Sequence, residues 1–495
     1  MGLDGALAIA SGGLANINGQ LALISQNVAN ASTPEYAAEI STQTSVTANG
    51  EGLGVHSGPA TRLVDTGLQA SVFNENSVVS GLQTEQTALQ AIDAAQGTPG
   101  QNDDLASLLN NVEDQFSTLL NDPSNQAQQS QVVSSATALT QQINALSTTY
   151  SSQRQSAQDT IVTDVATLDS TLDNIGTLNQ QIVAAKSIGN STADLENERD
   201  ADVQSLSQLV SVKTLVQANG DMLVTTSAGL MLPTVGAENQ LTTSDAIVAP
   251  GSWYPGGGVP AITLGGADVT SQFQGGSIGA NIELRDKTLP TCQAELDEFA
   301  QNLASRFSAQ GLALFTDPTG AVPAGGGVPV QSGYVGFAGT IQVNPAVQAD
   351  PSLVRDGTAA PPPGLAGYPD VIENVLNYTF GSEQSPGVPQ PPSNTSGLGA
   401  SGTLNAPYTA PPTLGGIAAT LVAAQAQESA STTSQLSTEQ AVQTTLASKL
   451  AAGSGVSMDT EMSNMISLQN AYGANARVLS TVQAMWTQLL NSVTA

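Results

Sequence analysis

Few side chains in this sequence have the chemistry that catalysis usually needs. Cys292 is the only cysteine and His56 the only histidine, and they lie far apart in the chain. Nothing near either residue frames a Ser-His-Asp or Cys-His arrangement, and these 495 residues cannot form a disulfide or a Cys/His metal cluster among themselves. Because Cys292 lies among Leu289, Leu296 and Phe299, we expect a buried, unreactive thiol. His56 lies in a Gly-rich stretch, and we expect it to be exposed.

The other candidate ligand sites are equally weak. The glycine run at 325–327 lacks the Gly-Lys-Ser/Thr of a phosphate-binding loop. Asp317 stands alone among its neighbours, which gives too few oxygen ligands for a calcium loop. Carboxylates are plentiful, so a chance pair leaves a hydrolase domain at 316–411 open as an alternative. We expect no enzyme activity, no cofactor and no metal site.

Two adjacent charge pairs, Arg199-Asp200 and Arg285-Asp286, remain as candidates for polar chemistry. Such a pair at a helix start can close an internal ion pair, or it can offer its charges to another chain. We favour the internal ion pair in both places. An interface role for Arg285 and Asp286 stays open as the alternative.

The charge balance limits the classes of partner. Acidic residues number 41 and basic residues 11, which gives a formal net charge of −30. Such a chain is repelled by nucleic acid and by anionic lipid. The N-terminus has no secretory signal, and we find no uncharged apolar run of 18 residues. We therefore expect no nucleic-acid partner, no membrane partner and, for a secreted chain, a route that needs no signal peptide.

The first thirty residues carry an apolar heptad pattern. Two series with a seven-residue period, offset by four, continue for four heptads and predict a helix that packs on a partner helix. Pro34 ends the pattern. The predicted N-terminal seam consists of Leu3, Leu7, Leu14, Ile17, Leu21, Ile24 and Val28, with Ala10 completing the first series.

The last forty residues repeat this design after a breaker at Gly453-Ser454-Gly455. Asn475 interrupts the apolar series, and a buried Asn in such a place often fixes the register of two helices. We expect Trp486 to belong to the core of this seam. The predicted C-terminal seam consists of Met458, Met465, Leu468, Tyr472, Asn475, Leu479, Val482, Trp486 and Leu489.

Both terminal helices are short of charge on every face. Asp4 is the only charged residue of segment 1–34, and segment 456–495 contains only Asp459, Glu461 and Arg477. A helix that faces solvent usually carries charged side chains on its outer face. The uncharged faces favour burial between several subunits, and a simple antiparallel hairpin within one chain is the alternative.

Both ends also resemble a known family. The segment Asn27-Val-Ala-Asn30-Ala-Ser-Thr-Pro34-Glu-Tyr36 resembles the N-terminal signature of bacterial flagellar axial proteins, which usually have Gly where this chain has Glu35. The segment from Gly455 through Leu468-Gln-Asn-Ala-Tyr472 to Asn475-Ala-Arg-Val-Leu479 resembles their C-terminal signature. The residues that carry the N-terminal motif are Asn27, Asn30, Pro34 and Tyr36.

The middle of the chain predicts long helices. Helical patterns run over 78–96 and 105–120, then from an N-cap at Asp122-Pro123 to about Lys186, where Gly176 could introduce a bend. A further helix starts near 194, and a strand–turn–strand pattern follows over 212–226. Another helix follows 276–286, with Leu296, Phe299, Leu303 and Phe307 on it.

These interior segments resemble the hook-associated junction proteins of the same family. The resemblance implies a structural subunit at the junction between hook and filament, exported by the flagellar type III apparatus. It implies self-association into a ring, contacts with hook protein and with a second hook-associated or filament-side protein, and an export chaperone. The implied location is extracellular after a transient cytoplasmic stage. Alternatives are a hook or distal rod subunit, a secreted coiled-coil adhesin or a phage tail component.

We therefore expect a mainly α fold in three parts. The terminal helices, 1–45 and 453–495, form a coiled-coil polymerisation domain whose segments 1–40 and 455–495 order on assembly. An elongated helical bundle comprises 75–215, 276–315 and 412–452. A variable β-rich or irregular outer domain covers 316–411, together with 236–275 as an option.

Overall fold

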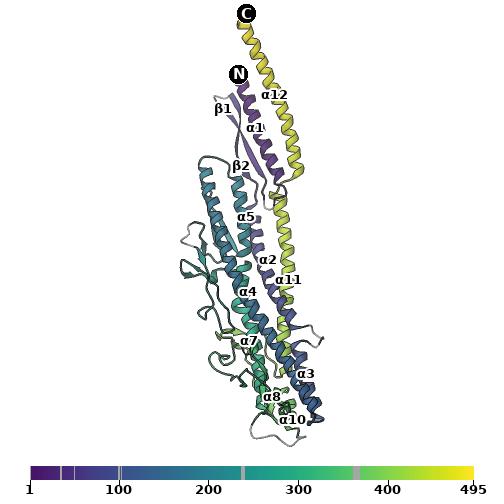
Figure 1. The fold of residues 1–495 in the computed structure, drawn as a ribbon. Helices are drawn as coiled ribbons and strands as arrows, with labels where there is room; N and C mark the ends of the chain where they lie inside the picture. Colours follow the sequence, from purple (N-terminus) through teal and green to yellow (C-terminus); the bar gives the residue numbers. More distant parts are fainter. Residues whose placement is uncertain are drawn as a thin grey trace.

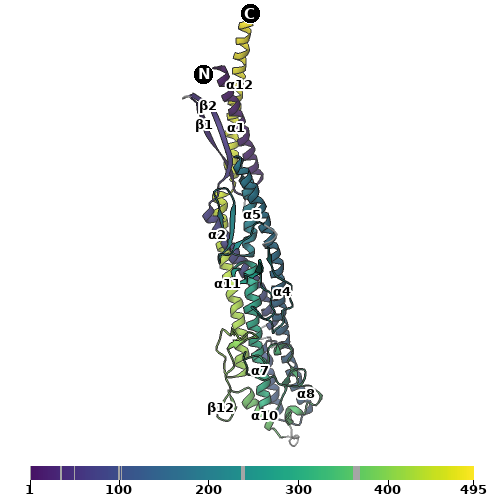
Figure 2. The same ribbon diagram turned by 90° about the vertical axis from the view of Figure 1, so that its left-hand side faces the viewer.

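The computed structural model describes residues 2–33, 36–48, 51–97, 101, 103–235, 240–359 and 368–494. The molecule is long and narrow, and both termini lie at one end (Figure 1, Figure 2). Helices make up 61% of the chain, and the strands are short and scattered, so the predicted mainly α class is confirmed.

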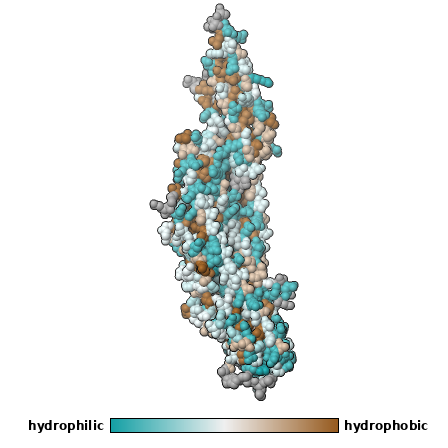
Figure 3. Space-filling view, viewed as in Figure 1, coloured by the Kyte–Doolittle hydropathy of each residue, from teal (hydrophilic) through white to brown (hydrophobic). Residues whose placement is uncertain are grey.

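Two helices and a β-hairpin form the end that carries the termini. Helix α1 (Leu3–Ala29) runs antiparallel to α12 (Met458–Thr494), and the hairpin β1 (Glu39–Ala48) and β2 (Glu51–Arg62) lies against α1 (Figure 1). We call this set the terminal unit. The sequence analysis did not predict the hairpin. Apolar side chains are visible on the surface of this end (Figure 3).

A helical bundle forms the rest of the long axis. Its helices are α2 (Thr66–Gln96), α3 (Leu105–Leu120), α4 (Gln126–Ser187), α5 (Ala193–Leu209), α6 (Gly276–Glu283), the π-helical turn η3 (Leu284–Thr288), α7 (Leu289–Ala309) and α11 (Leu414–Ser454). The predicted N-cap of α4 at Asp122 is wrong. Asp122 and Pro123 form a turn, and Asn125 caps the helix by accepting a hydrogen bond from the Gln128 backbone N–H at 3.1 Å.

Gly176 does not end or interrupt α4. A Cβ at this position would lie 1.6 Å from the carbonyl oxygen of Thr234, so the glycine allows the segment after β5 (Met231–Leu232) to cross directly over the helix. The predicted role of Gly176 as a bend is therefore replaced by a close backbone approach.

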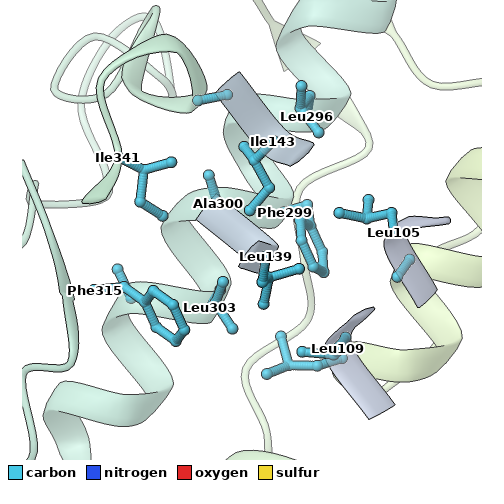
Figure 4. Packing of buried hydrophobic residues seen from close by; sticks show 14 of the residues in the cluster. Leu105, Leu109, Leu139, Ile143, Leu296, Phe299, Ala300, Leu303, Phe315 and Ile341 are labelled. Atoms are coloured by element: carbon cyan, nitrogen blue, oxygen red, sulfur yellow. The ribbon is translucent and has the colours of Figure 1, made fainter. Parts of the chain in front are cut away.

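The bundle contains two hydrophobic clusters in series along α4. The first, at the far end, joins α3, the first half of α4, α7 and the start of α11 (Figure 4). The second joins the later part of α4 with α5, α6 and β4 (Met222–Thr226). A buried polar layer separates them: Arg154 donates to the Arg285 carbonyl at 2.7 Å, and Arg285 donates to Gln158 Oε1 at 2.7 Å.

Short strands lie in the segments that connect the helices of the bundle. The predicted strand–turn–strand over 212–226 is confirmed as β3 (Val212–Val216) and β4 in antiparallel register, with β5 as third strand. The other strands are β6 (Leu241–Thr242), β7 (Thr263–Leu264), β8 (Ala267–Asp268), β9 (Phe315–Thr316), β10 (Gln342–Val343), β11 (Glu383–Ser385), β12 (Val388–Pro389), β13 (Ser396–Leu398) and β14 (Leu404–Asn405). Short helices are η2 (Thr270–Gln272), η4 (Phe337–Gly339), α8 (Pro345–Ala349), α9 (Leu353–Asp356), α10 (Asp370–Asn374) and η5 (Val375–Thr379).

The described part of 316–411 packs onto the bundle. Phe337, Ile341, Val347 and Val375 belong to the same hydrophobic cluster as α3, α4 and α7. Strands of two or three residues cannot enclose a core of their own, so this segment depends on the helices beneath it. In the described part of 236–275, Ile262 and Phe273 likewise join the second cluster.

Candidate subunit interface

Only some apolar side chains of the N-terminal seam are buried against α12 and the hairpin. Ile17 and Ile24 are buried, as is Ala10. These residues are seven apart, so one heptad series forms the contact with the neighbouring elements. The offset series is less covered: Leu3, Leu14, Leu21 and Val28 are half-buried, and Leu7 is exposed.

The C-terminal seam is covered still less. Val482 is its one buried member among the described residues. Met465, Leu468, Asn475 and Leu479 are half-buried, whereas Met458, Tyr472, Trp486 and Leu489 are exposed. The expected burial of Trp486 is therefore not seen in the single chain. Whether these residues pack in an assembly stays a prediction.

Other apolar side chains of the terminal unit were missed by the sequence analysis. The hairpin exposes Ile40, Val46, Leu53 and Val55, and α12 exposes Met462, Ile466, Val478, Met485 and Leu490. The alternation within 40–46 and 53–55 was an available signal for the hairpin. A monomeric soluble protein rarely leaves so many apolar side chains exposed in one region, so this surface is a candidate interface.

Asn475 and Gly13 set the distance between the terminal helices. A Cβ at Gly13 would lie 3.3 Å from Asn475 Nδ2, so the amide lies directly on the glycine backbone. The contact between Asn27 and Glu461, about 21 Å further along α1, has the same antiparallel register. In this register the last two turns of α12, which include Trp486 and Leu489, extend past the start of α1 (Figure 1).

Asn27 of the N-terminal motif connects three elements of the terminal unit. Its Nδ2 donates to the Glu39 carbonyl at 2.9 Å and to Glu461 Oε1 at 3.0 Å. Its Oδ1 accepts from the Tyr36 hydroxyl at 3.1 Å and from the Glu39 backbone N–H at 3.0 Å. The buried amide thus uses both of its N–H groups and both lone pairs, which a carboxylate or a hydroxyl could not do. This explains why the motif needs Asn here.

The other motif residues shape the chain after α1. Asn30 is the C-cap residue and accepts from the Thr33 hydroxyl at 3.1 Å. Pro34 and its neighbour Glu35 lie outside the described residues. Tyr36 reaches back to Asn27. Burial, followed by the nearby Asp194 carboxylate, raises the pKa of Glu39 to about 7.

Polar contacts join the terminal unit to the bundle. Asn197 of α5 accepts from the Ala37 N–H and donates to the Ala37 carbonyl, both at 3.3 Å. Arg62 at the end of β2 pairs with Glu196 at 3.1 Å and with Asp200 at 2.6 Å. These contacts are hydrogen-bonded and largely buried, so the hairpin is anchored to α5 rather than only resting on it.

The two predicted charge pairs have different outcomes. Arg285 is fully buried and holds Asp286 with two hydrogen bonds of 2.8 and 2.6 Å, which confirms the internal ion pair. The expected Arg199–Asp200 pair is wrong. Arg199 donates to Asn179 Oδ1 and to the Gly220 carbonyl, while Asp200 faces Arg62. Adjacent residues on a helix point about 100° apart, so they easily face different neighbours.

The candidate catalytic residues are not brought together. Cys292 is buried in the first hydrophobic cluster, and burial raises the pKa of its thiol well above the usual range. His56 is exposed on β2 in the terminal unit. Within the described ranges, no group of three or more His, Cys, Asp or Glu side chains could hold a metal ion.

Helix α1 corrects one expectation. By length and composition alone it could cross a membrane, whereas the sequence analysis found no apolar run long enough. The residues after Asp4 carry no charge, and their scattered Gly, Ser, Asn and Gln lower the mean hydropathy without breaking the run. A helix that packs in a protein assembly passes the same test, so this finding alone does not place the chain in a membrane.

The comparisons with known proteins first define a class. Residues 449–492, which cover the end of α11 and nearly all of α12, match the family model described as the flagellar basal body rod FlgEFG protein C-terminal. The terminal helix is therefore similar to that of flagellar rod proteins, in line with the predicted resemblance to flagellar axial proteins.

The same comparisons then specify the hook-associated branch. Residues 89–319 match the model of the flagellar hook-associated protein FlgK helical domain. Over 223 residues the chain is 24% identical to flagellar hook-associated protein 1 of Bacillus subtilis (strain 168), which is 42% of this chain and 43% of that protein. The predicted resemblance to the hook-associated junction proteins is thus confirmed.

A solved structure of the flagellar hook junction protein FlgK from Burkholderia pseudomallei is 27% identical. It covers 52% of this chain and 46% of its own, with a TM-score of 0.42. The chain therefore spans less than half of the length of the relatives that it matches.

Proposed function

We propose that this chain is a structural subunit of the bacterial flagellum that forms the junction between hook and filament. The observation that carries the proposal is the match of 89–319 to the hook-associated helical domain. This segment includes the long helix α4 and most of both hydrophobic clusters, so it is the body of the molecule and not a peripheral motif.

The terminal unit supplies the assembly surface in this proposal. Its exposed apolar side chains lie on both helices and on the hairpin, so several neighbours are needed to cover them. Copies of the chain associate into a ring, with hook protein on one side and a second hook-associated or filament-side protein on the other. The unpartnered faces of α1 and α12 remain loosely held in the single chain and become ordered on assembly.

The route and the location follow from the same proposal. The chain leaves the cytoplasm through the flagellar type III apparatus with the help of an export chaperone and functions outside the cell. It catalyses no reaction, uses no cofactor and acts without nucleic acid or membrane as partner. A hook or distal rod subunit is the nearest alternative, but the match to the hook-associated helical domain and the 61% helix content favour the junction subunit.

The test is deletion of the gene, scored by electron microscopy of the cell surface and by flagellin in the medium. Hooks without filaments, together with flagellin lost to the medium, are the expected result. Missing hooks would move the protein inward to the rod or hook. Normal flagella, with no second copy of the gene, would reject the axial function and favour an adhesin or a phage tail component.

A further inference from the structure

A hollow of about 300 Å³ opens between α1, β1 and α12. Its floor contains the Glu39 and Glu461 carboxyl groups beside Asn27, and both carboxyl groups belong to buried side chains. Leu23, Ile40 and Leu468 also line the hollow and are less buried than the two carboxyl groups, beside neutral polar side chains such as Asn464 and Ser467. The hollow therefore combines two buried acidic groups with apolar and neutral polar side chains nearer the surface.

This combination fits a long cationic side chain. An arginine buries its aliphatic stem against apolar walls and presents a planar guanidinium that binds carboxylate oxygens. Asn27 donates to Glu461 Oε1 at 3.0 Å, and Asn197 of α5 donates to Glu39 Oε1 at 3.4 Å, with the Asp194 carboxyl group also near Glu39. Both glutamates retain acceptor capacity for a further donor, since a carboxylate accepts about four hydrogen bonds.

The same chain carries a matching cation. Arg477 and Arg62 are the only basic residues of segments 1–62 and 456–495. Arg62 already forms ion pairs with Glu196 and Asp200. Arg477 is exposed on α12, and no carboxylate of the described residues lies within ion-pair distance of its guanidinium. Arg477 is thus the exposed Arg or Lys side chain of the described terminal unit, in a chain of net charge −30.

Arg477 cannot reach the hollow of its own chain. It follows Glu461 on α12 by about 24 Å along the axis, and it points roughly 160° away around the helix. Cation and hollow thus lie on opposite faces of one helix at different heights. This is the geometry of a heterologous contact, in which each copy gives its cation to one neighbour and receives another in its hollow.

We propose that Arg477 of one copy enters the Glu39–Glu461 hollow of a second copy, and that this contact sets the stagger between neighbouring subunits. This inference rests on the proposed function, because it assumes that copies assemble side by side. Each neighbour is displaced along the long axis by about the height difference of the two sites, so the contact builds a rising series rather than a flat pair.

Site-specific disulfides in the assembled flagellum test this contact. Ser467→Cys places a thiol at the rim of the hollow, and Ser480→Cys places one a turn from Arg477, while both charged partners stay in place. The two positions are about 20 Å apart on one helix, so they cannot form a disulfide within one chain. The matched control pairs Ser480→Cys with Gln469→Cys, which lies about 3 Å from Ser467 in height but about 160° around the helix, outside the lining of the hollow. The native Cys292 is buried and should stay silent.

The expected result is a disulfide-linked dimer in isolated flagella for the Ser467/Ser480 pair, at least tenfold more abundant than for the control pair. Adding Arg477→Glu should remove this preference, and Arg477→Lys should keep most of it. The contact is overturned if the chain is present in the particles but the two pairs cross-link equally, or if Arg477→Glu changes nothing. Flagella that assemble normally without containing the chain would overturn the proposed function instead.

Discussion

The helical bundle and the terminal unit satisfy their apolar side chains in different ways. In α4, α5 and α7, apolar residues on the inner faces are buried by other helices of the same chain. In α12, Glu461 and Val482 are the only buried residues among the described side chains. The bundle therefore buries its core within a single chain, whereas the terminal unit leaves part of its apolar seam uncovered. Substitutions should accordingly act on stability in one region and on assembly in the other.

The largest contrast should come from aromatic residues. Phe307 contacts Phe116, Phe315 and Phe380 with ring centroids 5.1 to 5.8 Å apart in the first cluster. Phe307→Ala should lower the free energy of unfolding by about 3–5 kcal/mol, because it removes buried contacts and leaves a cavity. Guanidinium unfolding followed by circular dichroism measures this loss.

The matched change in the terminal unit is Tyr472→Ala. Tyr472 is exposed, so its loss should change the free energy of unfolding by no more than about 0.5 kcal/mol while reducing motility of the cells. Equal destabilisation by both variants would show that the two regions form one core, against the contrast drawn above.

A smaller effect is expected at Asn27. Asn27→Ala removes four hydrogen bonds and leaves the Glu461 carboxyl group without its donor, so the terminal unit should open more easily by about 1–3 kcal/mol. Hydrogen exchange of the backbone amides in β1 and at the end of α1 measures this opening. Asn30→Ala is the control, since its side chain makes only local contacts. Unchanged protection in Asn27→Ala would remove Asn27 from its proposed linking role.

The pH dependence of stability should also differ between the terminal unit and the helical bundle. Glu39 has its pKa raised to about 7, mainly by burial and then by Asp194, with Arg62 acting in the opposite direction. The folded terminal unit therefore favours the protonated group. The contribution of protonated Glu39 to the stability of the folded terminal unit is fully present below the ordinary pKa of about 4.5. This contribution is lost as the pH rises through about 7. Limited proteolysis should cut the terminal segments faster at pH 8 than at pH 5.

Glu39→Gln isolates this effect, because it keeps the shape of the side chain and removes the titration. Glu295 and Asp297 of α7 also have pKa values raised to about 7 by burial, so these two bundle groups contribute to pH dependence with the same sign as Glu39. In Glu39→Gln, the rate of proteolysis of the terminal unit should lose most of its pH dependence. The unfolding of the bundle should remain as dependent on pH as in the unsubstituted protein. A terminal unit with the same pH profile in both proteins would contradict this assignment.

The smallest contrast concerns helix caps. Asp65 caps α2 by accepting from the Gly67 and Leu68 N–H groups, and Asp104 caps α3 by accepting from the Ser107 N–H at 3.0 Å. Asp104→Ala should lower the free energy of global unfolding by about 1 kcal/mol. Asp65→Ala should lower it by less than about half of that, because the start of α2 lies at the junction with the terminal unit. Thermal unfolding of both variants checks the order.

Local patterns predicted most of the helices and one sheet. The segment 105–120 is α3 with the same bounds, and the predicted 212–226 hairpin is β3 and β4. Heptad spacing and Asn27 likewise marked elements of the terminal unit that meet in the structure. These features depend on periodicity, turn residues and caps, all of which act over a few residues.

What the sequence did not predict depends on distant partners. The hairpin over 39–62 is rich in Thr, Ser and Gly, and it is held by α1 and by Arg62 contacts to α5 that no local pattern reveals. Asp200 pairs with Arg62 rather than with its sequence neighbour for the same reason. The exposure of Trp486 cannot be predicted from heptads either, because a heptad marks a seam but not the chain that fills it.

Helix α4 has a mechanical consequence. It is one continuous α-helix from Gln126 to Ser187, about 93 Å long, and it contributes side chains to both hydrophobic clusters. A hinge would need a break in its backbone hydrogen bonds, and the helix has none over this length. A rotation applied to one end of the bundle is therefore transmitted along α4 to the other end. At mid-length, the hydrogen bonds among Arg154, Gln158 and Arg285 fix the orientation of the two hydrophobic clusters relative to each other.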